Sequence, residues 1–273
     1  MRRPALPQLE IQLYDAFAAA PLAGNPAAVV LLQEWLPDEQ LASVAGELNA
    51  WTAFARRDDE TRWRVRIFTI PPIVETALCG HGLLATARCL FDGPAAGADE
   101  LTLATRDGDV RARPLPGGAA LDFPTIRVVA ATAPPDLATA LGGRPLGWWR
   151  RAEGYPAWLA LFATAGELAA LPLDAWALRK FESLVLATAT DESGVAEIAS
   201  RLFQPMKSLI EDPAGGTQHA LAAPFWAARL GRQRIACRSA SPRGGRCVCE
   251  VMGERVVIEA PVTHAMTARL HLP

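Results

Sequence analysis

Short apolar or alternating segments dominate the first seventy residues of the chain. The segments 9–17, 27–32, 51–56 and 63–69 have the length and alternation of β-strands. A helix interrupts them: Pro37-Asp38-Glu39 opens an amphipathic run through Leu48, with acidic residues in the first turn, where the helix dipole favours them. The pattern predicts a protein in which strands alternate with a few helices.

One pattern occurs twice. Cys79-Gly80-His81-Gly82 leads into the apolar run 83–91, and Asp212-Pro213-Ala214-Gly215-Gly216-Thr217 leads into the apolar run 218–230. Both runs are rich in alanine and apolar on nearly every side, which is typical of a helix surrounded by protein. Each is followed by strand-like pieces, at 100–104, 109–113 and 119–123 in the first half and at 233–237, 246–251 and 255–259 in the second.

The repeat predicts two similar lobes. The stretch 123–135 is rich in proline and alanine, as linkers between domains often are. We therefore expect an N-terminal lobe of residues 1–124, completed by the C-terminal residues 262–273, and a C-terminal lobe of residues 125–261.

Composition narrows the class of protein. The 273 residues are 51% apolar, enough for one large core or two ordinary ones, and the formal net charge is only -2. A balanced charge lacks the basic surface that nucleic acids require, so we expect no nucleic-acid partner. The longest aliphatic stretch, 27–32, is far short of the ~20 residues of a membrane span. Arg2 and Arg3 are followed by prolines rather than an apolar signal segment, so we expect a cytoplasmic protein without membrane contact.

Five cysteines make an odd count, and a disulfide framework is not expected in this context. Cys247 and Cys249 place two thiols on one face of a strand, but no Cys or His near them in the sequence completes a metal-ligand set. We therefore interpret them as small buried apolar side chains and expect no metal.

The two glycine turns are the candidate binding elements. A helix start preceded by glycine exposes unpaired backbone N–H groups and the positive end of the helix dipole, and it attracts carboxylates and other anions. Neither turn has the Gly-Lys-Ser/Thr or G-x-G-x-x-G pattern of nucleotide sites. Two such starts facing one cleft would hold a small organic acid.

Groups that can move protons stand at the same turns. His81 and Cys79 lie at the first, Asp212 and Glu211 at the second. Each has a structural interpretation as well: His81 as a hydrogen-bonded residue at a helix start, Asp212 as a helix N-cap, and Cys79 as a buried thiol. The residues alone leave both interpretations open.

Six blocks of sequence span almost the whole chain: Asp15-Ala16-Phe17, Gly24-Asn25-Pro26-Ala27-Ala28-Val29, Glu47-Leu48-Asn49, Leu78-Cys79-Gly80-His81, Glu211-Asp212-Pro213 and Arg243-Gly244-Gly245. Together, and in this order, they resemble the PhzF-like proteins of phenazine biosynthesis. The resemblance implies an α+β fold of the diaminopimelate-epimerase type, with two pseudo-symmetric lobes, each a curled and mostly antiparallel sheet around a central helix. It also implies a homodimer that uses no metal or organic cofactor and relocates protons in a small carboxylate bound between the lobes.

The resemblance assigns site residues by position. His81 and Asp212 match residues that line the family's catalytic cleft, and Asn25 matches a residue at the cleft edge. The substrate-carboxylate cradle corresponds to Gly80, Gly82, Gly216 and Thr217, with Gly215 beside them in the second turn. Cys79 resembles the first thiol of the related proline racemases, whereas their second thiol has no counterpart here.

One position departs from the family. Where members carry the glutamate that shuttles the proton, alignment of the following Thr-Ala-Phe places Trp51. Three hypotheses stay open. The protein is an isomerase in which Asp212 and His81 divide the base and acid roles, with Trp51 as an apolar wall for a cyclic, unsaturated, amino-acid-derived carboxylate of secondary-metabolite or antibiotic biosynthesis. Alternatively it is a non-catalytic relative that binds a small acid, or a thiol-dependent epimerase that uses Cys79 with Asp212.

Overall fold

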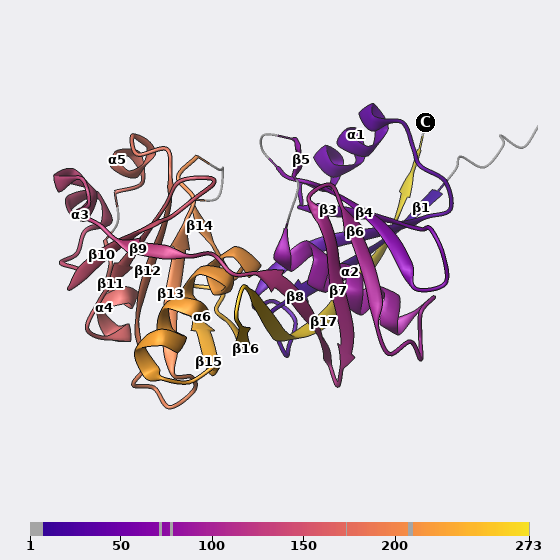
Figure 1. Ribbon diagram of the computed structural model, residues 1–273. Coiled ribbons are helices and arrows are strands. Elements are labelled where there is room, and N and C mark those ends of the chain that lie inside the picture. The colour runs from indigo at the N-terminus through magenta and orange to yellow at the C-terminus, as the bar shows by residue number, and fades with distance from the viewer. Residues whose placement is uncertain (1–7, 71–72, 77–78, 173, 207–209, 273) are drawn as a thin grey trace, which may run out of the picture.

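The computed structural model describes residues 8–70, 73–76, 79–172, 174–206 and 210–272. Two lobes lie side by side, and in each a strongly bent sheet wraps around one central helix (Figure 1). Arg2, Arg3, Leu78 and Pro273, which entered the predictions above, lie outside the described residues.

The N-terminal lobe contains most of the strands that the alternating pattern predicts. Its elements are β1 (Gln8–Ala16), β2 (Asn25–Leu32), α1 (Asp38–Leu48), β3 (Thr52–Arg57), β4 (Arg62–Phe68), β5 (Glu75–Thr76), α2 (Gly80–Asp92), β6 (Leu101–Thr105), β7 (Gly108–Leu115) and β8 (Gly118–Pro124).

The C-terminal lobe repeats this plan and adds short helices on its outer side. Its elements are β9 (Val128–Ala130), α3 (Pro135–Leu141), β10 (Gly147–Arg151), β11 (Ala157–Leu161), α4 (Ala165–Ala169), α5 (Ala175–Arg179), β12 (Leu184–Thr190), β13 (Ile198–Phe203), β14 (Glu211–Asp212), α6 (Gly216–Leu230), β15 (Arg234–Ser239), β16 (Gly245–Met252) and the first part of β17 (Arg255–His271).

Strand pairing shows that the lobes are related by an internal repeat. In the first lobe β2 pairs parallel with β3, β3 antiparallel with β4, β4 antiparallel with β5 and β4 parallel with β6. In the second lobe β11, β12, β13, β14 and β15 pair in the same order and senses. Phe68 lies opposite Glu75, and Phe203 lies opposite Glu211. The central helix begins at the same spacing after each glutamate, so the two glycine turns are structural equivalents.

Both central helices are buried on all sides, as their alanine-rich sequences predict. Leu83, Leu84 and Ala85 of α2 and Leu221 and Ala222 of α6 have no exposed surface. Small side chains let the bent sheets approach the helix closely.

Pro224 lies inside α6 without breaking it. Proline has no N–H to give to the carbonyl four residues earlier, which leaves the Ala220 carbonyl without its helical donor. The Ile126 N–H donates to that oxygen at 2.9 Å, so the helix is satisfied by the segment that joins the lobes.

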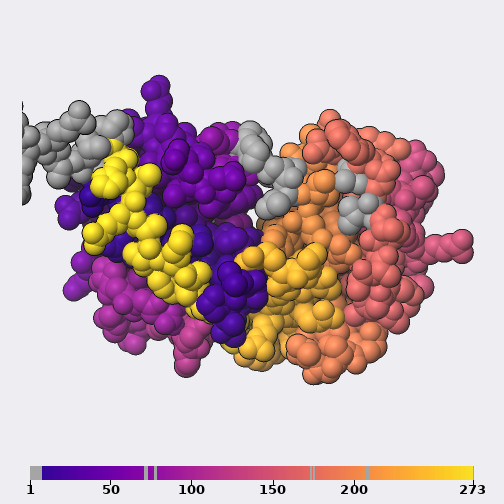
Figure 2. Space-filling view, turned by 180° about the vertical axis from the view of Figure 1, so that it is seen from behind, coloured from indigo at the N-terminus to yellow at the C-terminus, as the bar shows by residue number. Residues whose placement is uncertain are grey.

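β17 connects the lobes a second time. Its first part pairs with β16 and with β8, and its last part pairs with β1 from Ala16↔Val262 to Gln8↔His271. Figure 2 shows this end of the chain, in yellow, lying across the N-terminal lobe. The sequence predicted a strand only at 255–259. The rest of β17 was not predicted, because many of its residues are polar and exposed and do not form a continuous apolar segment.

None of the helices in the described part of the chain is long and apolar enough to cross a membrane.

Candidate active site

The starts of the two central helices meet where the lobes join. A Cβ added to Gly80 would lie 2.5 Å from the Gly216 Cα, and a Cβ added to Gly216 would lie 2.9 Å from the Gly80 Cα. Both distances are shorter than real Cβ contacts, so only glycine fits at either position. The glycines therefore allow the N-terminal ends of both central helices to face the same space.

A cavity of about 740 Å³ lies at this junction. Eight of the residues predicted from the sequence line it: Trp51, Cys79, Gly80, His81, Asp212, Gly215, Gly216 and Thr217. Asn25 and Gly82 do not. Asn25 is buried behind Asp212, and Gly82 faces away from the cavity, where a Cβ would lie 3.1 Å from Ile67 Cδ1 and 3.2 Å from Cys79 Sγ. Gly82 thus makes room for the thiol.

Asp212 presents its carboxyl group to the cavity from β14. Burial raises its pKa from 3.8 to about 7, although hydrogen bonds from the Ala214 N–H and Asn25 oppose the shift. Asn25 Nδ2 donates to Asp212 Oδ1 and to the Ala214 carbonyl, both at 2.7 Å, which fixes the orientation of the carboxyl group. A side chain at Gly215 would reach within 2.7 Å of Asp212 Oδ2, so this glycine also serves the carboxyl group.

A buried ion pair holds the strand that carries Asp212. Arg201 Nε and Nη2 donate to the two carboxylate oxygens of Glu211 at 2.7 and 2.8 Å, and Arg201 Nη1 donates to the Leu168 carbonyl. The two-pronged geometry fixes Glu211, and with it the neighbouring Asp212.

His81 faces Trp51 and Cys79 at the other wall. Burial lowers the pKa of His81 from 6.5 to about 4, so its imidazole is neutral near pH 7. The Trp51 and His81 rings are 5.0 Å apart between centroids, and Cys79 Sγ lies 3.5 Å from His81 Nδ1. The cavity therefore combines a neutral imidazole, an aromatic wall and a carboxyl group that titrates near neutrality.

Comparisons with known proteins show which family the chain is similar to. The family model for phenazine biosynthesis-like proteins matches residues 14–134. An uncharacterized isomerase of Pseudomonas aeruginosa is 38% identical over 267 residues, which is 97% of this chain and 100% of the relative. The phenazine biosynthesis-like domain-containing protein 2 of Mus musculus is 32% identical and covers 87% of this chain and 90% of its own length. A crystal structure of a PhzF-family phenazine biosynthesis protein of Enterococcus faecalis superposes with a TM-score of 0.90 at 30% identity, over 97% of this chain and 100% of that one.

The chain belongs to the PhzF-like family. The α+β fold of the diaminopimelate-epimerase type is confirmed, and similarity to relatives named as isomerases makes this protein an isomerase by family. The blocks that carry the resemblance also receive a physical explanation. Arg243 Nη2 donates to Asp15 Oδ1 at 3.0 Å, and its guanidinium also donates to the carbonyls of Ala23 and Gly24. These hydrogen bonds connect the two lobes.

Further cavity residues of this PhzF-like protein escaped the sequence analysis. They are Val74, Glu75, Thr76, Arg106, Asp107, Phe123, Pro124, Ile126, Arg151, Tyr155, Ser183, Leu184, Leu202, Gln204, Pro205, Met206 and Ala220. The internal repeat contains a signal for one of them. Arg66-Ile67-Phe68 before Glu75 matches Arg201-Leu202-Phe203 before Glu211, and Arg66 Nη2 bonds Glu75 at 2.6 Å as Arg201 bonds Glu211.

Cys247 and Cys249 are buried, as the sequence predicted, but potential ligands do lie beside them. Cys237 on β15 and His219 on α6 reach them in the folded lobe. Neighbours along the chain gave no sign of this, since the four residues come from three different elements.

Proposed function

We propose that this protein is a cofactor-independent isomerase that moves a proton or a double bond in a small, cyclic, unsaturated, amino-acid-derived carboxylate. The observation that carries the proposal is the Asp212 carboxyl group, whose pKa of about 7 lies in the range a proton shuttle needs, in a cavity formed by two helix starts.

The helix starts supply the binding energy for the substrate carboxylate. Gly80 and Gly216 bring unpaired N–H groups together without side chains between them, and Thr217 adds a hydroxyl group beside them. An anion held there is stabilised by both helix dipoles. The carbon next to that carboxylate then lies within the space that Asp212 and His81 border.

Proton transfer needs only one base. Ionised Asp212 removes a proton from carbon, the electron pair shifts into the conjugated acid, and the protonated carboxyl group returns the proton to another carbon on the same face. Neutral His81 is a weak base, since its pKa is about 4, and it contributes a hydrogen bond to the developing charge. Trp51 replaces the family's glutamate with a flat apolar surface against which a ring can stack.

Deuterium exchange tests the proposal. Cyclohexadiene and dihydropyrrole amino carboxylates are incubated with the protein in heavy water, and carbon-bound deuterium is followed by NMR. We expect exchange that falls at least about 100-fold in Asp212→Asn, the size of a general-base contribution. Asp107→Asn is the matched control, because Asp107 lines the same cavity but is exposed. Binding of these acids without any exchange would instead support a non-catalytic small-acid-binding protein.

A thiol-dependent epimerase is the second candidate, favoured by the 3.5 Å contact between Cys79 Sγ and His81 Nδ1. A thiol beside an imidazole can be activated as a base. Cys79→Ser would then abolish exchange as strongly as Asp212→Asn, whereas the carboxyl mechanism predicts that most of the exchange survives. A homodimer and a place in antibiotic biosynthesis stay predictions from the resemblance, and a cytoplasmic location stays a prediction from the sequence. Light scattering of the purified protein tests the homodimer.

A further inference from the structure

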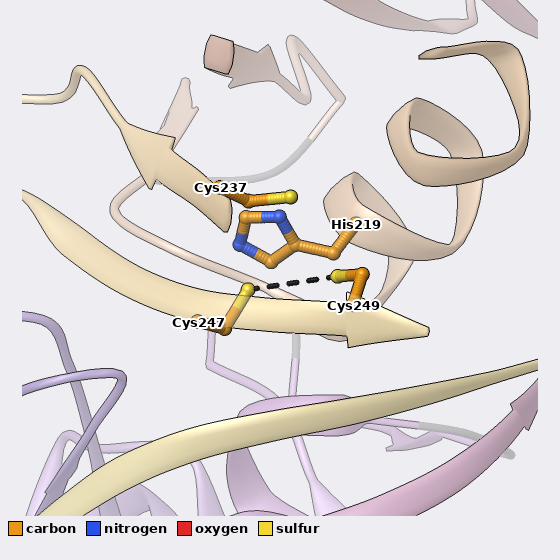
Figure 3. A group of neighbouring side chains, drawn as sticks. All are labelled: His219, Cys237, Cys247 and Cys249. Atoms are coloured by element: carbon orange, nitrogen blue, oxygen red, sulfur yellow. Dashed lines mark hydrogen bonds between the residues drawn. The ribbon is translucent and has the colours of Figure 1, made fainter. Parts of the chain in front are cut away.

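Four potential metal ligands meet inside the C-terminal lobe, and none of them lines the cavity. His219 reaches inward from α6, Cys237 from β15, and Cys247 and Cys249 from β16 (Figure 3). Their ligand atoms all lie within 4.8 Å of one another. Cys237 and Cys247 are direct cross-strand partners, so the β15–β16 ladder itself brings the thiols together.

The cluster is closed to solvent. His219 and Cys249 are 0% exposed, Cys237 is 1% and Cys247 is 5%. Neither ring nitrogen of His219 has a hydrogen-bond partner within the part of the chain that the structure describes. A buried polar nitrogen without a partner costs about 1–3 kcal/mol, and most such groups in native proteins have one. The imidazole is therefore aimed at three sulfur atoms with its own bonding need unmet.

We propose that His219, Cys237, Cys247 and Cys249 bind one Zn²⁺ ion in a tetrahedral Cys₃His site. With Zn–S bonds of about 2.3 Å, a tetrahedron places its sulfur atoms about 3.8 Å apart. Cys247 Sγ and Cys249 Sγ already lie 3.7 Å apart. The other ligand atoms lie at most 4.8 Å from one another, so each of these separations needs to shorten by only about 1 Å for a metal to bind.

Charge balance at the site also favours a cation. Binding of Zn²⁺ would release the thiol protons of all three cysteines. The complex would carry a charge of about −1 beside the first turn of α6, whose positive end offsets it.

A site with four protein ligands leaves no open position and is structural rather than catalytic. The position of the metal site shows which part of the fold it would stabilise. The His219 N–H donates to the Gly215 carbonyl, so His219 lies one helical turn after the glycines that line the cavity. The metal would fix the start of α6 against β15 and β16, whatever reaction the cavity performs.

Metal titration of the full-length protein tests the site. The purified protein is stripped with a chelator under reducing conditions and titrated with Co²⁺, then with Zn²⁺. We expect one equivalent of Co²⁺ with the intense visible bands of tetrahedral thiolate ligation, displaced by one equivalent of Zn²⁺, and a rise of Tm on zinc binding. X-ray absorption of the zinc form should give three sulfur neighbours at about 2.3 Å and one nitrogen at about 2.0–2.1 Å.

Cysteine variants locate the metal. Cys249→Ser and Cys237→Ser should weaken Co²⁺ binding at least about tenfold and reduce the thiolate bands, while Cys89→Ser, which removes a buried thiol from α2, should leave both unchanged. The proposal is overturned if the wild-type protein binds no stoichiometric Co²⁺ or Zn²⁺, if the bands survive replacement of all three cysteines by serine, or if mass spectrometry of the intact protein finds Cys237 and Cys247 in a disulfide. Metal binding by the wild-type protein and the intact mass are measured without any variant, so the proposal can be tested even if a cysteine variant fails to fold.

Discussion

The raised pKa of Asp212 makes the free energy of unfolding depend on pH. Its pKa is 3.8 in an ordinary environment and about 7 in the folded protein, so between these values the folded state keeps a proton that the unfolded state has released. This contribution to stability is complete below about pH 4 and is lost as the pH rises through 7. His81 works in the opposite sense: its lowered pKa contributes stability above pH 6.5 that is lost as the pH falls through about 4.

Asp212→Asn should therefore flatten the alkaline side of the stability curve. The wild-type unfolding free energy should fall between pH 5 and pH 8. In the variant we expect this fall to be smaller by about 2 kcal/mol, a value reduced for the partial exposure of the side chain. Urea unfolding at the two pH values measures it. An equal pH dependence in wild type and Asp212→Asn would contradict the raised pKa of Asp212.

Gly80 is required for steric reasons. Gly80→Ala would press its methyl group against the Gly216 backbone, which can move only by separating the helix starts. We expect a loss of about 3 kcal/mol in unfolding free energy, together with weaker binding of small carboxylates. Gly166→Ala in α4 is the control. Its nearest neighbour would be Thr164 Oγ1 at 3.6 Å, so this variant should be neutral or gain up to about 1 kcal/mol. Equal effects of the two substitutions would show that the close approach does not limit position 80.

At the scale of elements, the internal repeat offers a matched pair of ion pairs. Arg201–Glu211 secures β14 and Arg66–Glu75 secures β5, but the Arg201 side chain is 9% exposed and that of Arg66 is 22% exposed. Removing one partner of a buried pair leaves an uncompensated charge. Arg201→Met should therefore cost about 3 to 5 kcal/mol and lower deuterium exchange through the displaced Asp212, whereas Arg66→Met should cost about 1 kcal/mol.

Chemical unfolding and the exchange assay measure both variants. Rescue of Arg201→Met by the additional change Glu211→Gln would support the charge argument, because the double variant leaves no unpaired carboxylate. If Glu211→Gln does not reduce the loss of unfolding free energy, Arg201 stabilises the lobe through packing instead.

Elements differ in how far their sequence reveals them. The glycine turns, the helices after them and the strands of the first lobe are local patterns, and the sequence predicted them. The ligand cluster around His219 is not local: Cys247 and Cys249 share a strand face, but Cys237 reaches them through ladder register and His219 through the packing of α6 inside the sheet. Asn25 likewise contacts Asp212 from the other half of the chain, a contact that spacing along the chain does not reveal.

For the whole molecule, β17 determines whether the lobes unfold separately. Ile258 is buried, with Leu121 of β8 on one side and Cys249 of β16 on the other, so this strand is internal at that point. Ile258→Pro removes a ladder hydrogen bond there and should cost about 3 kcal/mol or more. Because both lobes pair with this stretch, we expect hydrogen exchange to speed up in α2 and α6 alike. Arg269→Pro, at an exposed position where β17 pairs with β1, should raise exchange only in the N-terminal lobe. Faster exchange confined to one lobe in Ile258→Pro would mean that the lobes are independent folding units despite the shared strand.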